Sequence, residues 1–313
     1  MGRAFTFPGQ GSQAVGMGQP LADAVPAARE VFEEVDDALN QNLSHLMWHG
    51  PIEELTLTAN AQPALMAVSL AVVRVLERDM GLDWGTAVQF VAGHSLGEYS
   101  ALAAAGMFTL SDAAVLLKAR GQAMQQAVPV GEGAMAALLG LDFDIVVQIV
   151  ETAAEQGVCV TASDNAPGQV VVSGTKAAVD YAIDLAKQAG AKRALPLAVS
   201  APFHCSLMAP AAEVMARELE QVAIAPPRVP LVANVTASPV SDPSTIRSLL
   251  VEQVTNMVRW RESVARMVSE GVDTFVEIGA GKTLSGLAKR IDRDVTIRNL
   301  EMPQDLEAFA KEI

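Results

Sequence analysis

A sharp strand-to-helix bend at residues 93–97 constrains the fold more than any other feature of the sequence. A short, mostly apolar run, Val88–Ala92, leads into Gly93-His94-Ser95-Leu96-Gly97, and the Ala-rich segment Glu98–Ala105 follows. Such a run is typical of a buried strand, and alanine favours helix. Glycines flanking the serine permit a tight turn that lifts its hydroxyl clear of the sheet. The pattern predicts an α/β protein with a nucleophilic serine, although a chance match to the short motif is the alternative.

The middle third of the chain predicts a small domain inserted into a larger one. The expected order from residue 134 to 197 is strand, helix, strand, strand, helix, strand, which is the order of a ferredoxin-like unit. We assign residues 130–197 to this inserted domain. Residues 1–129 and 198–313 then form a larger, α/β-hydrolase-like domain around a parallel sheet.

The hydrophobic pattern places the individual elements. In the larger domain, strands are predicted at residues 4–7, 88–92, 231–234 and 274–278, and helices at residues 22–41, 62–80, 98–105, 111–126, 244–255 and 261–270. In the inserted domain, strands are predicted at residues 134–141, 158–162, 169–173 and 192–197, and helices at residues 143–156 and 177–189.

Composition excludes several classes of protein. A chain of 313 residues that is 50% hydrophobic and 19% charged can bury a sizeable core and is not disordered. Its net charge of −14 disfavours binding to nucleic acid or to an anionic membrane. The two cysteines form no CxxC pair, which favours a reduced, cytoplasmic setting. The longest uncharged runs, Leu55–Val73 and Ala194–Ala212, contain polar residues or prolines and are not predicted to span a membrane.

Four histidines are the candidates for the base that a serine nucleophile needs. His94 adjoins Ser95, and consecutive side chains near a strand end point apart, so His94 suits packing better. His45 and His49 are expected at the surface, and no third ligand for a metal lies nearby in the sequence. His204 lies in an uncharged, proline-bent loop that suits a base, although a buried core histidine is the alternative. No aspartate stands out, so we expect a Ser–His dyad whose imidazole is oriented by a carbonyl group.

Two further features allow alternative interpretations, and a third can be excluded as a phosphate-binding loop. The segment Gly9–Gln13 either forms a simple glycine turn or supplies N–H groups that complete an oxyanion hole with Leu96. Arg120, on a predicted helix, is either an ion-paired surface residue or a clamp for a substrate carboxylate in the serine pocket. The segment Gly279–Thr283 lacks the earlier glycine of a phosphate-binding loop, because Val276 stands there, so we expect a close-packed turn.

An ordered set of motifs spans the chain and resembles one known family. The motifs are GQGSQ at 9–13, GHSLGE at 93–98, KARG at 118–121, NAPGQ at 165–169, SAPFH at 200–204, QVTNMVRW at 253–260 and EIGAGKTLSGL at 277–287. Together they resemble the malonyl-CoA:acyl-carrier-protein transacylases of type II fatty acid synthesis. The resemblance implies that Ser95 accepts the acyl group, that His204 is its base, and that Gln10 and Leu96 supply the oxyanion-hole N–H groups. Arg120 would then hold the malonyl carboxylate.

The resemblance implies three further roles. The carbonyl of Gln253 would orient the base, and Asn165 would lie near the pocket on the small domain. In related acyltransferase domains, a phenylalanine at the position of Phe203 accompanies a preference for malonyl over methylmalonyl groups, since its ring fills the space of an α-methyl. The chain departs from the family pattern at three positions, which are Met257 and Ala280 in place of proline and Asp164 in place of an aromatic residue.

The activity implied is ping-pong transfer of malonyl from malonyl-CoA to the phosphopantetheine thiol of an acyl carrier protein, with no cofactor. We expect a monomer with no nucleic-acid or membrane partner, to which the carrier docks transiently through charge. The basic candidates for docking are Lys192, Arg193, Lys282, Lys289 and Arg290. Three alternatives remain open: a serine thioesterase or esterase, a non-catalytic acyl-binding scaffold, and a malonyl transferase of a polyketide or malonate decarboxylase pathway.

Overall fold

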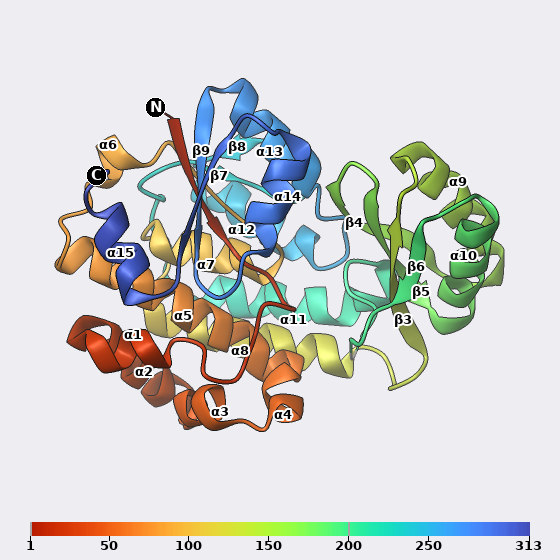
Figure 1. Ribbon diagram of the computed structural model, residues 1–313. Helices are drawn as coiled ribbons and strands as arrows, with labels where there is room; N and C mark the ends of the chain where they lie inside the picture. The colour runs from red at the N-terminus through yellow and green to blue at the C-terminus, as the bar shows by residue number, and fades with distance from the viewer. Residues whose placement is uncertain (1, 200) are drawn as a thin grey trace.

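The computed structural model describes residues 2–199 and 201–313, which form two β-sheets with helices packed around them (Figure 1). The larger sheet has the order β10-β9-β1-β2-β7-β8, and only the β7–β8 pair is antiparallel. Its strands are β1 (Gly2–Phe7), β2 (Phe90–Gly93), β7 (Leu231–Val232), β8 (Pro239–Val240), β9 (Val272–Ile278) and β10 (Thr296–Leu300).

Helices cover both faces of this sheet, because side chains along a strand alternate between the two faces. Phe5 and Phe7 belong to a core shared with α2, α5, α7 and α8, whereas Ala4 packs in a second core with α13 and α14. The helices of this domain are α1 (Gln19–Ala24), α2 (Pro26–Leu39), α3 (Leu43–His49), α4 (Ile52–Thr56), α5 (Thr58–Arg78), α6 (Trp84–Ala87), α7 (Leu96–Ala104), α8 (Leu110–Gln126), α11 (Ala209–Gln221), α12 (Pro243–Gln253), α13 (Trp260–Ser269), α14 (Thr283–Ile291) and α15 (Pro303–Phe309).

The smaller sheet is antiparallel, with the order β4-β5-β3-β6. It consists of β3 (Gly133–Leu139), β4 (Cys159–Ala166), β5 (Gln169–Thr175) and β6 (Arg193–Pro196). The helices α9 (Phe143–Ala153) and α10 (Lys176–Gln188) cover its outer face, away from the larger sheet (Figure 1). This is the ferredoxin-like arrangement, so the predicted fold class is confirmed. We retain the boundaries 130–197 for the inserted domain and 1–129 with 198–313 for the larger one as a proposal.

Several element boundaries differ from the predictions. The single helix expected over residues 22–41 is divided into α1 and α2, because Val25 has an extended backbone directly before Pro26. The strand β4 continues to Ala166, four residues beyond its predicted end, because its last residues pair with β5 up to the turn at 167–168. The edge strand β10 was not predicted, since its polar, half-exposed residues lack a hydrophobic pattern.

The helix α5 is long and apolar enough to cross a membrane by length and composition. Within the protein, however, 83% of its most apolar window is buried against other elements. Its side chains form the centre of the core that also includes Phe5 and Phe7. Its hydrophobicity is therefore that of a central core helix.

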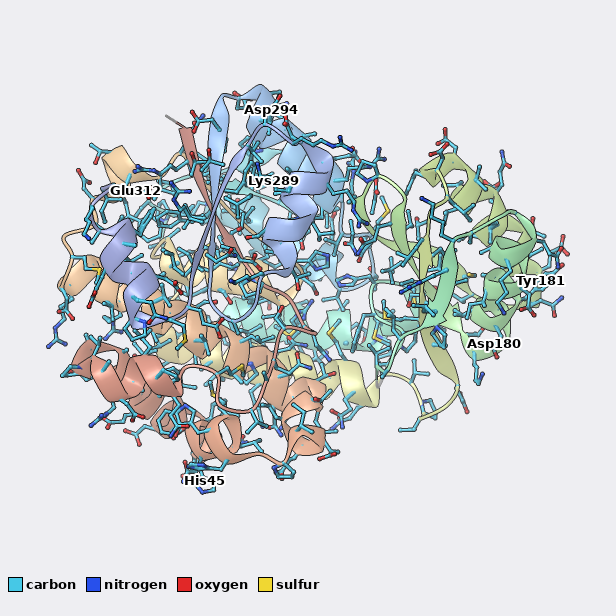
Figure 2. The ribbon with its side chains drawn as sticks, in the orientation of Figure 1. His45, Asp180, Tyr181, Lys289, Asp294 and Glu312 are labelled. Carbon is cyan, nitrogen blue, oxygen red and sulfur yellow. The ribbon has the colours of Figure 1, made fainter. Side chains whose placement is uncertain are left out.

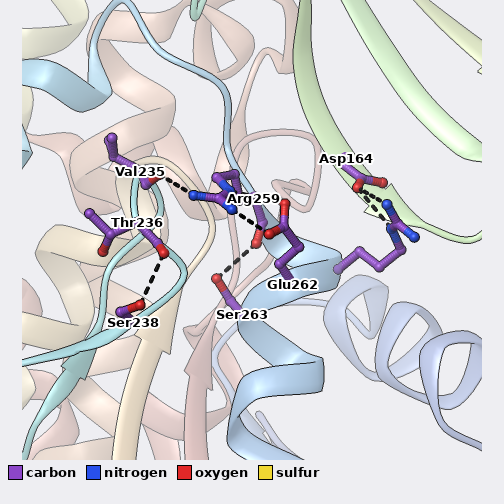
Figure 3. Close-up of polar contacts among 8 residues, drawn as sticks. Asp164, Val235, Thr236, Ser238, Arg259, Glu262 and Ser263 are labelled. Carbon is purple, nitrogen blue, oxygen red and sulfur yellow. Dashed lines mark hydrogen bonds and ion pairs between the residues drawn. The ribbon is translucent and has the colours of Figure 1, made fainter. Parts of the chain in front are cut away.

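The two domains are joined by backbone and side-chain contacts beside the start of α13. Asp164 on β4 donates its backbone N–H to the Val258 carbonyl over 3.0 Å, and the Val258 N–H donates to the Ala162 carbonyl over 2.9 Å. The buried Asp164 carboxylate also forms an ion pair with Arg261 on α13, at 2.7 Å (Figure 3). Burial raises the pKa of Asp164, and the Arg261 guanidinium opposes that effect. The charge that departs from the family pattern thus has a partner in the other domain.

Candidate active site

The bend between β2 and α7 holds Ser95 in a strained backbone conformation. Its φ of 54° and ψ of −108° lie in a region that side-chain-bearing residues rarely occupy. A Cβ atom at Gly93 would lie 1.9 Å from the Gly97 carbonyl oxygen, and one at Gly97 would lie 2.2 Å from the carbonyl oxygen of Phe7. Only glycine fits at either position, so the sequence motif is required by close backbone packing.

Ser95 and His204 form a hydrogen-bonded pair. The Oγ of Ser95 lies 2.8 Å from Nε2 of His204, and Nδ1 of that ring lies 2.8 Å from the carbonyl oxygen of Gln253. Since the carbonyl can only accept, Nδ1 carries the hydrogen and Nε2 is free to accept the serine proton. Burial, aided by the charge of Arg120, lowers the pKa of His204 to about 3. The imidazole is therefore neutral near pH 7, as a general base must be.

Arg120 projects from α8 directly into this site and is 1% exposed. Its Nη2 donates to Ser95 Oγ over 3.1 Å and to Gln253 Oε1 over 2.7 Å, while its Nη1 donates to Gln62 Oε1 over 2.8 Å. None of the ion pairs found among the described residues includes Arg120. Burial lowers its pKa, but a guanidinium remains charged near neutral pH. The site thus holds a positive charge that can receive a carboxylate.

A buried polar network under the bend holds its geometry. Asn234 accepts the backbone N–H of Ser95 at its Oδ1 over 2.8 Å and donates from Nδ2 to the Gly93 carbonyl over 2.7 Å. Glu98 accepts the Asn234 backbone N–H over 2.9 Å, and the side-chain amide of Gln253 donates to the same carboxylate. Burial raises the pKa of Glu98 to about 7. The strained bend is therefore held by side chains from distant parts of the chain.

Three members of this site were not predicted from the sequence, which are Gln62, Glu98 and Asn234. Two of them carried a usable signal. Glu98 is an acid directly before an alanine-rich apolar segment, and a buried acid in such a place needs partners. Asn234 ends a predicted strand, and polar residues at the carboxyl ends of parallel strands commonly line sites. Gln62 lies in the middle of an apolar helix, and nothing in the sequence marks it as a site residue. Only its contact with Arg120 in the structure does so.

The loop after β1 packs against the bend. A Cβ atom at Gly9 would lie 2.8 Å from the His94 carbonyl oxygen, so this loop approaches the bend as closely as backbone permits. The Gln10 side chain donates to Thr58 Oγ1 over 3.2 Å. Leu96 is the first residue of α7, where helices leave backbone N–H groups unpaired. This arrangement brings the two segments that carry the predicted oxyanion-hole residues side by side.

The remaining candidates divide into those near the site and those far from it. Asn165 Oδ1 lies 2.8 Å from His94 Nε2, so the end of β4 in the small domain meets the bend. Phe203, 8% exposed, precedes the base in the core of the larger domain. His45 points outward from α3 (Figure 2), with its ring centroid 4.7 Å from that of His49. Among the described residues, no three potential metal-ligating side chains gather. Ser200, which opens the SAPFH motif, lies outside the described residues.

The basic side chains proposed for docking share one property. Among the ion pairs of the described residues none involves any of them, whereas most arginines on other exposed surfaces are paired. Two lie on α14: Lys289 (Figure 2) donates to the Arg293 carbonyl over 3.0 Å, and Arg290 donates to Gln169 at the start of β5 over 2.8 Å. The remaining members of the set are Lys192, Arg193 and Lys282.

Comparisons with known proteins identify the family to which the chain is similar. The acyl transferase domain model matches residues 4–293. The malonyl CoA-acyl carrier protein transacylase of Bacillus subtilis is 47% identical over 305 residues, covering 97% of this chain and 95% of that protein. The crystal structure of an acyl-carrier-protein S-malonyltransferase from Bartonella henselae is 56% identical with a TM-score of 0.98, covering 100% of this chain and 99% of that one.

A second similar solved structure is that of a type II polyketide acyl carrier protein in complex with its malonyl-transacylase. The matching chain is 42% identical, with a TM-score of 0.96, and the match covers 100% of both chains. The matches extend over essentially the whole chain. They include the strand-to-helix bend, the base-bearing loop and the inserted domain. The chain therefore belongs to the acyl transferase family, and within it to the malonyl CoA-acyl carrier protein transacylases.

Proposed function

We propose that this protein transfers the malonyl group of malonyl-CoA to the phosphopantetheine thiol of an acyl carrier protein, and so supplies fatty acid synthesis. One observation carries the proposal: Ser95 Oγ lies 2.8 Å from His204 Nε2 and 3.1 Å from Arg120 Nη2. A hydroxyl that contacts both a neutral base and a buried guanidinium is suited to an acyl group with its own carboxylate. The names of the similar proteins point to the same substrate.

In the first half-reaction, Ser95 Oγ attacks the thioester carbonyl while His204 Nε2 takes its proton. The tetrahedral oxyanion accepts hydrogen bonds from the backbone N–H groups of Leu96 and Gln10. When the C–S bond breaks, His204 returns the proton to the leaving CoA sulfur, and a malonyl ester remains on Ser95. In the second half-reaction, the carrier thiol attacks this ester with His204 again as base, and the proton returns to Ser95 Oγ.

Arg120 selects the malonyl group in this proposal. Its guanidinium presents a planar pair of donors that match a carboxylate, and no acid among the described residues is ion-paired with it beforehand. Holding the far end of the acyl group fixes the ester carbonyl at Ser95 and limits the approach of water. The Gln253 carbonyl orients His204, and Asn165 and Phe203 complete the pocket walls.

The acceptor is a carrier protein that docks by charge. The five basic side chains named above lack ion-pair partners among the described residues, so they can meet an acidic surface. Raising the ionic strength from about 0.05 M to about 0.5 M should slow transfer to the carrier protein but not to free pantetheine. Equal effects on both acceptors would contradict this docking mode. The expectations of a cytoplasmic monomer with no cofactor, and with no nucleic-acid or membrane partner, stay predictions.

The alternatives have unequal support. A serine thioesterase would use an acid to orient its histidine, whereas a backbone carbonyl holds Nδ1 of His204 here. A non-catalytic scaffold has no need of the strained Ser95 or its contact with His204. A malonyl transferase of a polyketide pathway is the second candidate, because a similar solved structure contains a polyketide carrier protein. Its chemistry is identical, and only the acceptor differs.

Intact-mass measurement after mixing with malonyl-CoA tests the proposal. The wild type should gain the mass of one malonyl group, and Ser95→Ala should gain none. Ser100→Ala is the matched control, since Ser100 is a buried serine on α7 whose hydroxyl makes no hydrogen bond among the described residues. Holo carrier protein should then remove the group faster than water does. An unmodified wild type would indicate a scaffold, and hydrolysis faster than transfer would indicate a thioesterase.

A further inference from the structure

Glu98 is a buried carboxylate that the reaction described above does not use. It is 1% exposed and lies in the first turn of α7, three residues after Ser95. One oxygen accepts the backbone N–H of Asn234 over 2.9 Å, and the other accepts the side-chain amide N–H of Gln253. A carboxylate without a direct cationic partner is costly to bury. Its position therefore calls for an explanation beyond packing.

Two acceptors hold the Gln253 amide in one orientation, because its Nε2 donates to the Glu98 carboxylate and, over 2.9 Å, to the backbone carbonyl of Ser95. An ionised carboxylate can only accept hydrogen bonds, so it draws the NH2 group of that amide. The opposite end of the amide, Oε1, then faces Arg120 and accepts from Nη2 over 2.7 Å. The same Nη2 donates to Ser95 Oγ over 3.1 Å. If the amide were reversed, its NH2 group would meet the guanidinium, donor against donor.

We infer that Glu98 is a positioning residue that, together with the Ser95 carbonyl, fixes the orientation of the Gln253 amide and thereby holds Arg120 Nη2 beside Ser95 Oγ, ready for the malonyl carboxylate. This inference rests on the proposed function. Glu98 contacts neither Ser95 Oγ nor His204 directly, and it acts through Gln253. It also places a negative charge on the far side of the amide from the guanidinium, which raises the pKa of Arg120 against the effect of burial.

The variant Glu98→Gln tests the inference with an isosteric change. The Asn234 N–H needs an acceptor, so the new amide keeps its oxygen there and turns its NH2 group toward Gln253. Two NH2 groups then meet, so the Gln253 amide is pushed away from its position, with only the Ser95 carbonyl left to accept from its Nε2. We expect kcat/KM for malonyl transfer from malonyl-CoA to Ser95 to fall by about 10- to 100-fold, because hydrogen bonds of a charged group are lost. For acetyl-CoA, which has no carboxylate, the fall should be less than about threefold.

Glu277→Gln provides a matched control. Glu277 is also a 1% exposed glutamate, and it accepts backbone N–H groups of Leu284 and Ser285, but it lies at the end of β9 outside the site. This control should lower thermal stability while leaving the malonyl-to-acetyl ratio unchanged. If Glu98→Gln behaves like the control, or lowers malonyl and acetyl transfer equally, Glu98 has only a structural role and the inference is wrong.

The pH profile of the wild type gives a second measurement that does not depend on a variant that folds. The charged and titratable groups that interact with Glu98 are Arg120 on α8 and Tyr99 beside it, while His204 and His94 belong to the same bend through their contacts with Ser95 and Asn165. Burial raises the pKa of Tyr99 and lowers those of His94 and His204, the latter to about 3. Glu98, with a pKa of about 7, is the member expected to change charge between pH 6 and 8.

Protonation of Glu98 places an O–H opposite the Gln253 amide, as Glu98→Gln places an N–H. The malonyl-to-acetyl ratio should therefore fall as the pH drops from about 8 to about 6, and Glu98→Gln should show a flat ratio. A flat ratio in the wild type would overturn the inference. A wild type that takes no malonyl group at any pH would instead overturn the proposed function, so the two failures are distinguishable.

Discussion

Two strand-to-helix turns of the larger domain have the same local design but different chemistry. The turn from β2 to α7 contains Ser95, and the turn from β9 to α14 contains Gly279 and Gly281 with positive φ. In the second turn, the carboxylate of Glu277 accepts the N–H groups of Leu284 and Ser285 over 3.0 and 2.7 Å. The donors at the start of α14 are thus already occupied, as in a structural helix end.

In the turn from β2 to α7, the acidic residue has different hydrogen-bond partners. Glu98 lies in the first turn of α7, but its carboxylate is directed to Asn234 and Gln253, and no side chain caps the helix. The N–H groups of Gly97 and Glu98 are taken instead by the carbonyls of His94 and Ser95, over 3.0 Å each, which leaves the Leu96 N–H for an external anion. The difference teaches that the acid of a glycine-rich turn caps the helix in a structural turn and orients neighbouring side chains in a functional one.

Removing the base should give the largest contrast between the two turns. In His204→Ala, malonyl-serine formation should slow by about 10⁴-fold, because nothing then takes the proton from Ser95. Thr283→Ala, at the first residue of α14, should leave the rate within about twofold. Rapid-quench intact-mass measurements give both rates. A His204→Ala protein that acylates at nearly the wild-type rate would remove the base from the mechanism.

Removing the guanidinium should have the next largest effect. Arg120→Ala leaves an uncharged cavity beside Ser95, so kcat/KM for malonyl-CoA should fall by about 10²- to 10³-fold. The rate with acetyl-CoA should change much less, since acetyl carries no carboxylate. Steady-state kinetics with both thioesters measure the ratio. An unchanged preference for malonyl would mean that the carboxylate is recognised elsewhere.

The smallest effect on activity is expected in the turn from β9 to α14. Glu277→Ala removes the acceptor of two backbone N–H groups, which should lower the free energy of unfolding by about 1–3 kcal/mol. Malonyl transfer by the folded protein should stay within about twofold of the wild type. Thermal denaturation and the acylation rate together check this expectation. A large loss of acylation without a loss of stability would show that the turn from β9 to α14 also takes part in the reaction.

Much of the fold was predictable, because it follows from local patterns. The order of elements in the inserted domain and the strand before Ser95 were confirmed within a few residues. The errors lie where a tertiary contact decides the outcome. β10 is a polar edge strand that exists only through its pairing with β9, and β4 was extended by its pairing with β5.

The site was predictable in part. The residues brought together around Ser95 include His204 and Arg120, both of which carried chemical signals in the sequence. The orientation of His204 by a carbonyl was expected from the lack of a suitable aspartate and agrees with the observed contact. Glu98 and Asn234 were missed although both carried a signal, because an acid before an apolar segment and an amide at a strand end do not reveal a partner 136 residues away in the sequence.

The local sequence was enough to predict the bend at Ser95, because a Cβ atom at Gly93 would clash with the carbonyl of Gly97, four residues further on. Its geometry also depends on distant residues, since Gly97 packs on the Phe7 carbonyl and Asn234 accepts the Ser95 N–H. Folding alone decided that Arg120, His204 and Gln253, which follow Ser95 by 25, 109 and 158 residues, converge on this one residue: the first two contact its hydroxyl, and the Gln253 amide donates to its backbone carbonyl. Contacts over such separations depend on how the helices and both domains pack, and no local pattern encodes that packing.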